Sequence, residues 1–344
     1  MNLRGILFRK SFLGRASGLL VFAALFFGMA RAQGCQQANE IEPGIRAEID
    51  NAALQYIQFA VHGDVQSLRQ ASIPLLANQF GSVQQAVTHD RGLLGDQVTI
   101  RREYLLDASK ATTRLASAEF FCGAYGPNGH TPSTAGFAIP SLDPGLYALV
   151  LTNVGGGKLP YMATVVLQKL QGQWKLAGYY PKPTEAAGHD AAWYVVQARQ
   201  FKQSGQIVNA WLYYVLGWDI YCPVDFMSSL QLDKLSGEIQ DSRPAGLPVS
   251  GPVSLGAANG RSYTLTQMFA APDDRGELSL VVRYEVPSVA NTAQAEQDNI
   301  TVIKAIVAKY PEVRAAYSCI VARATTPGGQ DYGTLLKMTD IFRQ

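Results

Sequence analysis

The sequence predicts an α+β protein in which helices come first, an antiparallel meander follows, and a second small α+β unit closes the chain. Three observations predict this class. Apolar residues recur at helical spacing after residue 40, short strand-like runs separated by glycine-containing turns come next, and further strands surround one amphipathic helix near the end. Because the helices precede the strands, we expect a helix-covered antiparallel sheet rather than a parallel one.

The first residues predict a secretory signal that does not belong to the fold. Basic residues at positions 4–15 precede an apolar stretch at residues 18–29, and Ala30-Arg31-Ala32 fits a cleavage site before Gln33. The apolar stretch is much shorter than the roughly 20 residues that cross a bilayer as a helix. We therefore expect residues 1–32 to be removed and the protein to be exported, to the periplasm or outside the cell. The alternative is a membrane-anchored lipoprotein with lipid attached at Cys35.

Composition narrows the choice of partners. The whole chain has 29 Lys and Arg against 27 Asp and Glu, and the predicted signal carries basic residues but no acidic ones, so the remainder is slightly acidic. No basic stripe is present that could neutralise phosphates, which argues against a nucleic-acid partner. A hydrophobic content of 47% over 344 residues is enough for more than one domain with its own core.

The cysteines give a second indication of the compartment. All of them follow the predicted signal and none forms a C-x-x-C pair; they are Cys35, Cys122, Cys222 and Cys319. An even number in an oxidising compartment permits two disulfides, with three pairings that the sequence does not separate. The alternative is buried reduced cysteine, which behaves as a small apolar residue.

The region after residue 40 predicts two helices and then strands. Ile49, Ala53 and Ile57 share one helical face, the helix ends at His62-Gly63, and Asp64 is a candidate N-cap for a second helix. Strand-like runs follow at 98–106, 114–121, 146–154, 161–170 and 174–180. Glycine-containing turns at 155–157 and 171–173 join the last of these as an antiparallel meander.

Two motifs in this region carry a family resemblance. Gly63-Asp64 lies between the two predicted helices, and Gly172-Gln173-Trp174-Lys175-Leu176 lies in the last hairpin. With these motifs, residues 41–183 resemble the nuclear transport factor 2-like superfamily, which includes the SnoaL-like proteins and ketosteroid isomerase. The resemblance implies a cystatin-like cone of helices and antiparallel strands. The Gly/Pro-rich insertion at 123–145 departs from the compact family pattern and leaves the strand count open.

A helical hairpin is predicted at 188–226, with two helices around Ser204-Gly205. Its small and aromatic positions resemble one tetratricopeptide repeat; they are Ala198, Phe201, Gly205, Ala210, Tyr214 and Gly217. Only one copy is present, and a single repeat does not cover its own apolar face. We therefore expect the hairpin to pack on a neighbouring domain.

The last part of the chain predicts a linker and a small domain. Residues 235–262 are rich in Gly, Pro and Ser and are typical of a linker or a long surface loop. Residues 263–344 then predict strands at 263–269, 278–286, 318–325 and 332–338, with one helix ending near Tyr310. This is a β-β-α-β-β unit, whose sheet we expect to be covered on one face by that helix.

The sequence contains no motif that specifies a reaction. H-E-x-x-H, G-x-S-x-G, S-x-x-K, a Walker A loop and a dinucleotide-binding fingerprint do not occur. The four histidines are widely separated, so no metal site and no cofactor are predicted. Resemblance to ketosteroid isomerase implies Asp and Tyr side chains in the cone, and its dehydratase relatives imply a His/Asp pair. The candidates for these roles are His89, Asp90, Tyr104 and Asp107.

We expect a non-enzymatic role for the exported protein in the cell envelope, either in ligand binding or in assembly. The cone is the predicted ligand pocket, with Tyr56 and Tyr104 on its wall, and the partner is a small apolar ligand or another envelope protein. Two alternatives stay open. One is a small-molecule isomerase or lyase acting in the cone, and the other is a lipoprotein subunit of an envelope complex, which would meet the membrane through Cys35.

Overall fold

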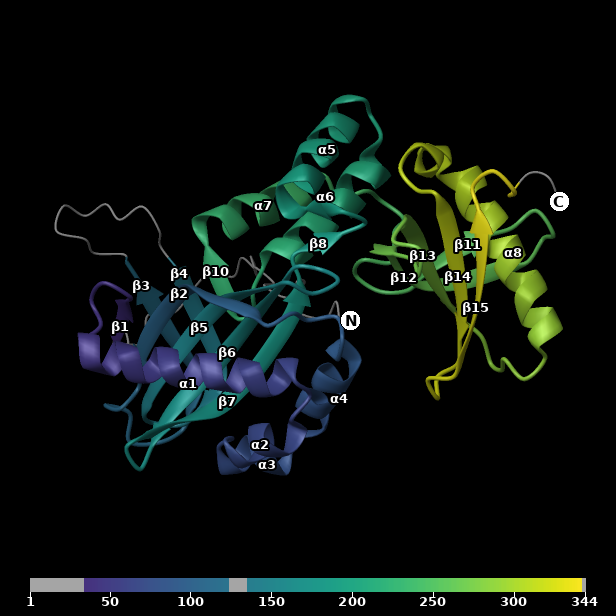
Figure 1. The fold of residues 1–344 in the computed structure, drawn as a ribbon. Coiled ribbons are helices and arrows are strands. Elements are labelled where there is room, and N and C mark those ends of the chain that lie inside the picture. Colours follow the sequence, from purple (N-terminus) through teal and green to yellow (C-terminus); the bar gives the residue numbers. More distant parts are fainter. Residues whose placement is uncertain (1–33, 124–134, 342–344) are drawn as a thin grey trace, which may run out of the picture.

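The computed structural model describes residues 34–123 and 135–341 and has the α+β class that the sequence predicts (Figure 1). The predicted signal lies outside the described residues. Two five-stranded sheets, each packed against helices, are separated along the chain by the helices α5, α6 and α7. None of the described helices is long and apolar enough to span a membrane.

The first helices follow from their caps and apolar faces. Helix α1, Pro43–Val61, begins where the Glu42 carboxylate accepts hydrogen bonds from the amides of Gly44 and Ile45. The predicted N-cap Asp64 accepts a hydrogen bond from the Ser67 amide and starts α2, Val65–Gln70. Two further helices complete this layer, α3 (Pro74–Asn78) and α4 (Gly81–Asp90).

The first sheet is antiparallel, with the order β1-β2-β5-β6-β7. Its strands are β1 (Gly34–Gln37), β2 (Gln97–Asp107), β5 (Leu146–Gly155), β6 (Tyr161–Leu170) and β7 (Gln173–Pro183). The meander β5-β6-β7 is the one that the two glycine turns predict. Helix α1 lies across one face of this sheet, where apolar side chains of the helices and strands form one buried cluster (Figure 1).

The other face of the first sheet is covered by strands that the sequence did not place there. Strand β3, Leu115–Cys122, corresponds to the run predicted at 114–121 and pairs with β4, Ala135–Leu142, in a separate sheet of order β10-β4-β3. Strand β4 lies inside the predicted insertion, and β10 is Met227–Ser229. Apolar residues of β3 and β4 pack against β2, β5 and β6 in a second buried cluster.

One disulfide joins these two sheets. Cys35 of β1 is bonded to Cys122 of β3, 87 positions later in the chain. Cys222 and Cys319 are free and buried, so of the two interpretations that the sequence leaves open, buried reduced cysteine describes these two residues. A Cys35 sulfur in a disulfide has no bond left for a lipid thioether, so the oxidised protein does not fit the lipoprotein alternative.

The helical hairpin forms as predicted. A short pair of strands, β8 (Glu185–Ala186) and β9 (His189–Asp190), leads into α5, Ala191–Gln203, and α6, Ile207–Tyr221. Gly205, with φ of 76°, makes the turn between the two helices. Most residues of α6 are buried, because α5, α7 and the C-terminal unit surround it.

The predicted linker at 235–262 is wrong for much of its length. Helix α7, Leu230–Asp241, occupies its first part, where Leu232, Leu235 and Ile239 are buried. Strand β11, Val253–Gly256, occupies a later part and pairs with β12. Gly, Pro and Ser dominate the composition between these elements, and they obscured a helix stripe and a strand too short to be recognised from their own residues.

The C-terminal unit is therefore β-β-β-α-β-β. Its remaining elements are β12 (Ser262–Pro272), β13 (Leu278–Glu285), α8 (Thr292–Lys309), a 3₁₀ turn (Pro311–Ala315), β14 (Cys319–Thr325) and β15 (Asp331–Lys337). The strand order follows the chain, with β13 and β14 parallel across the α8 connection. Helix α8 packs against this sheet, as expected.

The hairpin packs on the C-terminal unit. Buried residues of α5 and α6 belong to the same apolar cluster as those of β12, β13, α8 and β14. The Asn209 side-chain amide donates to the carbonyl of Glu312 at 2.6 Å, and the Tyr213 hydroxyl donates to the carbonyl of Ala316 at 2.8 Å. The hairpin thus covers its apolar face with a neighbouring unit rather than with further repeats.

Candidate ligand-binding site

The two tyrosines predicted to share a ligand pocket lie on opposite faces of the first sheet. Tyr56 belongs to the cluster beneath α1, where its hydroxyl donates to the Trp174 carbonyl at 2.6 Å. Tyr104 packs on the other face, edge-on to Phe137 with 5.0 Å between ring centroids. The sheet separates them, so they do not line one common cavity.

The weak catalytic candidates do not converge either. Asp90 is only 5% exposed, and its carboxylate accepts a hydrogen bond from the Tyr161 hydroxyl at 3.3 Å. Burial raises the pKa of Asp90. The charge of His89 and the hydrogen bond from Tyr161 act in the opposite direction and lower it in part. His89 is exposed, and Asp107 ends β2 by accepting hydrogen bonds from the amide and hydroxyl of Ser109. Asp90 and Tyr161 form a buried internal contact, and Asp107 is a turn residue.

A polar hollow of about 270 Å³ lies elsewhere, at the edge of the first sheet just beyond the end of β1. The turn from β1 to α1, the first two turns of α1 and the middle of β2 form its wall. The residues that line it are Gln37, Ala38, Asn39, Arg46, Asp50, Ile100, Arg101, Arg102, Glu103 and Tyr104. Tyr104 is the one predicted site residue among them.

The local backbone creates this hollow. Strand β1 ends at Gln37, opposite Tyr104, so β1 leaves the edge of β2 before that point uncovered. The pairing of β2 with β5 shifts between Ile100 and Arg102, so Arg101 is the extra residue of a β-bulge. Bulges occur often beside binding and active sites because they redirect side chains at a sheet edge. Two consecutive arginines are thereby placed on the wall of the hollow.

At the base of the hollow a buried carboxylate is paired with an arginine. The Glu103 side chain is 2% exposed, and the Arg46 guanidinium holds it. Arg46 Nε donates to both carboxylate oxygens of Glu103, at 3.0 and 3.1 Å, and Nη2 donates to one of them at 2.6 Å. This fork-shaped contact compensates for burying the Glu103 charge, which would otherwise be costly.

Asp50 lies one helical turn after Arg46 and is less well satisfied. Its Oδ2 is 4.0 Å from Arg46 Nε, while its Oδ1 is buried and accepts no hydrogen bond from any residue that the structure describes. Burial, followed by the neighbouring Glu103 carboxylate, raises the pKa of Asp50 to about 6, against the lowering effect of Arg46. Because Oδ1 has almost no accessible surface, a ligand in the hollow can reach this carboxylate only through Oδ2, in a side chain that is 27% exposed.

Two consecutive arginines of β2 add positive charge to the hollow. Arg101 and Arg102 are both exposed. Arg101 has one weak contact, from Nη1 to the Met162 sulfur at 3.9 Å, and Arg102 forms no ion pair within the described part of the chain. The floor of the hollow therefore carries carboxyl groups that are only partly paired, and its wall carries two arginines that can contact an anion.

Sequence reasoning missed Arg46, Asp50 and Glu103. The spacing of Arg46 and Asp50 by four helical positions was a readable signal of two charges on one face. Glu103 within the run at 98–106 was a second signal, because a carboxylate on the covered face of a sheet needs a partner. The bulge at Arg101 gave no signal, since it depends on pairing with β5, about 50 residues later.

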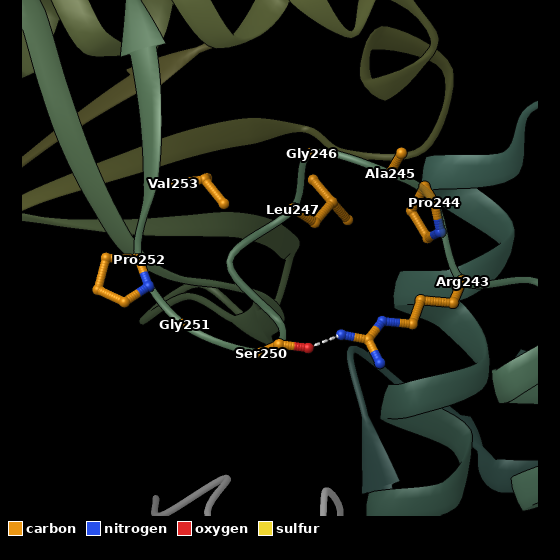
Figure 2. A pocket seen from close by; sticks show the side chains of 9 residues that line it. All are labelled: Arg243, Pro244, Ala245, Gly246, Leu247, Ser250, Gly251, Pro252 and Val253. Atoms are coloured by element: carbon orange, nitrogen blue, oxygen red, sulfur yellow. Dashed lines mark hydrogen bonds between the residues drawn. The ribbon is translucent and has the colours of Figure 1, made fainter. Parts of the chain in front are cut away.

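A second hollow, of about 360 Å³, lies in the loop between α7 and β11. Figure 2 shows Arg243, at the end of α7, reaching across to the hydroxyl of Ser250. The other lining residues are small or apolar, namely Pro244, Ala245, Gly246, Leu247, Gly251, Pro252 and Val253. With its single charged group already engaged, this hollow offers little chemistry for recognising a ligand.

Comparison with known proteins adds no assignment. No family model, no curated protein and no solved structure matches this chain. Within residues 34–123 and 135–341, no group of three or more His, Cys, Asp or Glu side chains is arranged to hold a metal ion. The polar hollow is therefore the feature of the molecule from which a function can be inferred.

Proposed function

We propose that this chain is an exported protein of the cell envelope that binds a small polar ligand in the hollow at Arg46, Asp50 and Glu103, without converting it. The observation that carries this proposal is the partly exposed Asp50 carboxylate, whose Oδ2 lies 4.0 Å from Arg46 Nε in a hollow that Arg101 and Arg102 also line. Of the two roles that the sequence predicts, ligand binding is the one that this hollow supports. The polar lining favours a polar ligand over the apolar one that the family resemblance implies.

Export is supported by the bond between Cys35 and Cys122. Structural disulfides persist in oxidising compartments and are rare in the cytosol, where thiols are kept reduced. This agrees with the signal that we infer at residues 1–32.

A small-molecule isomerase or lyase is the second candidate, and one observation favours it. The raised pKa of Asp50 puts this carboxyl close to neutrality, where a group can both accept and donate a proton. Binding is preferred because Arg46 and Glu103 are locked to each other, so no second acid or base near Asp50 is free to complete a proton transfer.

Native mass spectrometry of the protein purified from its own envelope fraction tests the proposal. We expect a mass above that of the mature chain by a small, non-covalently bound molecule that denaturation releases unchanged. Protein recovered without any bound molecule, or a released molecule that reappears chemically altered after incubation with fresh protein, would contradict the binding role. The second of these results would establish the enzyme.

A further inference from the structure

We propose that the ligand of this hollow is a small hydroxylated carboxylate of the sugar-acid class, which gives a hydroxyl hydrogen bond to Asp50 and places its carboxylate among the arginines. This inference rests on the proposed binding function and specifies its ligand. It follows from three properties of the hollow, which are its charge balance, its unpaired acceptor and its size.

The charge balance calls for an anion. Three guanidinium groups line the hollow, from Arg46, Arg101 and Arg102, against the carboxyls of Asp50 and Glu103. Arg46 and Glu103 neutralise each other through their forked contact. Asp50 then shares the hollow with Arg101 and Arg102, which form no ion pair with a described residue. A ligand with one negative charge balances the remaining positive charge, whereas a neutral sugar or a zwitterion leaves it unbalanced.

The unpaired acceptor calls for a donor on the same molecule. The Asp50 side chain is 27% exposed, and its Oδ2 lies 4.0 Å from Arg46 Nε, beyond hydrogen-bond distance. A hydroxyl satisfies it without adding positive charge, and hydroxyls can also reach the lining side chain of Asn39 and the uncovered backbone edge of β2. A carboxylic acid without hydroxyls leaves this oxygen unsatisfied.

The size suits one small ring. A volume of about 270 Å³ equals the liquid volume of about nine water molecules. One six-membered ring with a carboxylate and hydroxyl groups fits this space, and the rest of a peptide or an oligosaccharide would lie outside the lining residues. A single sugar acid therefore matches the hollow in charge, donors and size.

The test uses three probes that separate these requirements, with binding to the oxidised mature protein measured by titration calorimetry. D-Glucuronate carries ring, hydroxyls and carboxylate; D-glucose lacks the carboxylate; cyclohexanecarboxylate lacks the hydroxyls. We expect binding of glucuronate, with affinity weaker by at least about tenfold for each of the other two, because each lacks one charged or charge-assisted contact. Absence of glucuronate binding, or equal binding of all three, overturns the inference.

Two variants locate the binding. Asp50→Ala removes the acceptor and Arg102→Gln removes an exposed cation of the hollow, and each should weaken glucuronate binding by at least about tenfold. Lys110→Gln is the matched control, because it removes an exposed cation just beyond the far end of β2 and leaves the hollow intact. Unfolding curves show whether each variant is folded. Wild-type affinity in both folded variants would overturn the assignment to this hollow.

Two different measurements test the ligand class and the binding function, so one can be wrong while the other holds. If glucuronate does not bind while the envelope-purified protein releases another small molecule, the ligand class is wrong and the binding function holds. If the purified protein carries no molecule at all, the binding function itself is wrong.

Discussion

Asp50 lowers the stability of the folded protein and is also the acceptor of the proposed binding site. Its carboxyl is partly buried beside Glu103, so the folded protein holds its proton more tightly than the unfolded chain does. An ionised, incompletely paired carboxyl destabilises the fold at neutral pH, and such costs are typical of side chains retained for binding. Arg46 lowers this cost and does not remove it.

The first prediction concerns the pH dependence of stability. Because the folded-state pKa of Asp50, about 6, is above its unfolded value of about 4, the contribution of this group falls as pH rises through that window. Asp50→Asn should match wild type near the lower limit and exceed it by about 1 kcal/mol in free energy of unfolding at neutral pH, a value reduced for solvent screening. Urea unfolding across this range measures it. An equal difference at every pH would contradict the assignment.

The pairing of Arg46 with the buried Glu103 carboxylate should contribute to the stability of the protein. Removing its guanidinium in Arg46→Met leaves the buried Glu103 carboxylate without its partner, which is destabilising. Arg114→Met is the matched control, because Arg114 pairs with Asp143 in a contact where both side chains are about half exposed. We expect a clear fall in melting temperature for the first variant and a small change for the second. Equal effects would mean that burial of Glu103 does not matter.

Among the elements, those governed by local rules could be predicted from sequence and those governed by distant pairing could not. Helices α1 and α2 carry their own stop and cap signals at Gly63 and Asp64, and the meander β5-β6-β7 carries its turns. Strands β1 and β10 are short and their partners lie far away in the chain, and β4 lies in a Gly/Pro-rich stretch that predicted an insertion rather than a strand. The same reason hid the hollow, which exists because β1 ends early and β2 is bulged.

The Cys35–Cys122 bond gives a prediction about how these elements are held together. It closes a loop of 87 positions and ties β1 to β3 across two sheets. In the chain-entropy view, reduction or the double variant Cys35→Ser/Cys122→Ser should lower the free energy of unfolding by about 4.5 kcal/mol. Urea unfolding with and without reductant measures the loss, and reductant should not affect the double variant further. Unchanged wild-type stability on reduction would show that the bond is dispensable.

In the whole molecule, the hairpin and the C-terminal unit share one core while Lys182 joins the first sheet to the hairpin. The Lys182 ammonium donates to the carbonyls of Asp219 and Cys222 at the end of α6. Cations near a helix C-terminus satisfy its free carbonyls. The hairpin thus contacts both sheet-containing units.

The shared core predicts cooperative behaviour. The Tyr213 ring lies 5.9 Å from that of Tyr317, and its hydroxyl donates to Ala316. Tyr213→Ala should therefore cost about 3 kcal/mol and speed hydrogen exchange in β13 and β14 as well as in α5 and α6. Faster exchange confined to the hairpin would mean that the two units unfold separately.

The most direct test of the central claim, that the hollow at Arg46, Asp50 and Glu103 is the binding site, is hydrogen exchange with mass-spectrometric readout. Protein purified from the envelope with its bound molecule is compared with the same protein freed of that molecule by unfolding and oxidative refolding. The account predicts slower exchange with the molecule bound at residues 37–50 and 97–104, and little change elsewhere. Protection centred on residues 81–94 and 161–183 would contradict it and place the ligand beneath α1, beside Asp90.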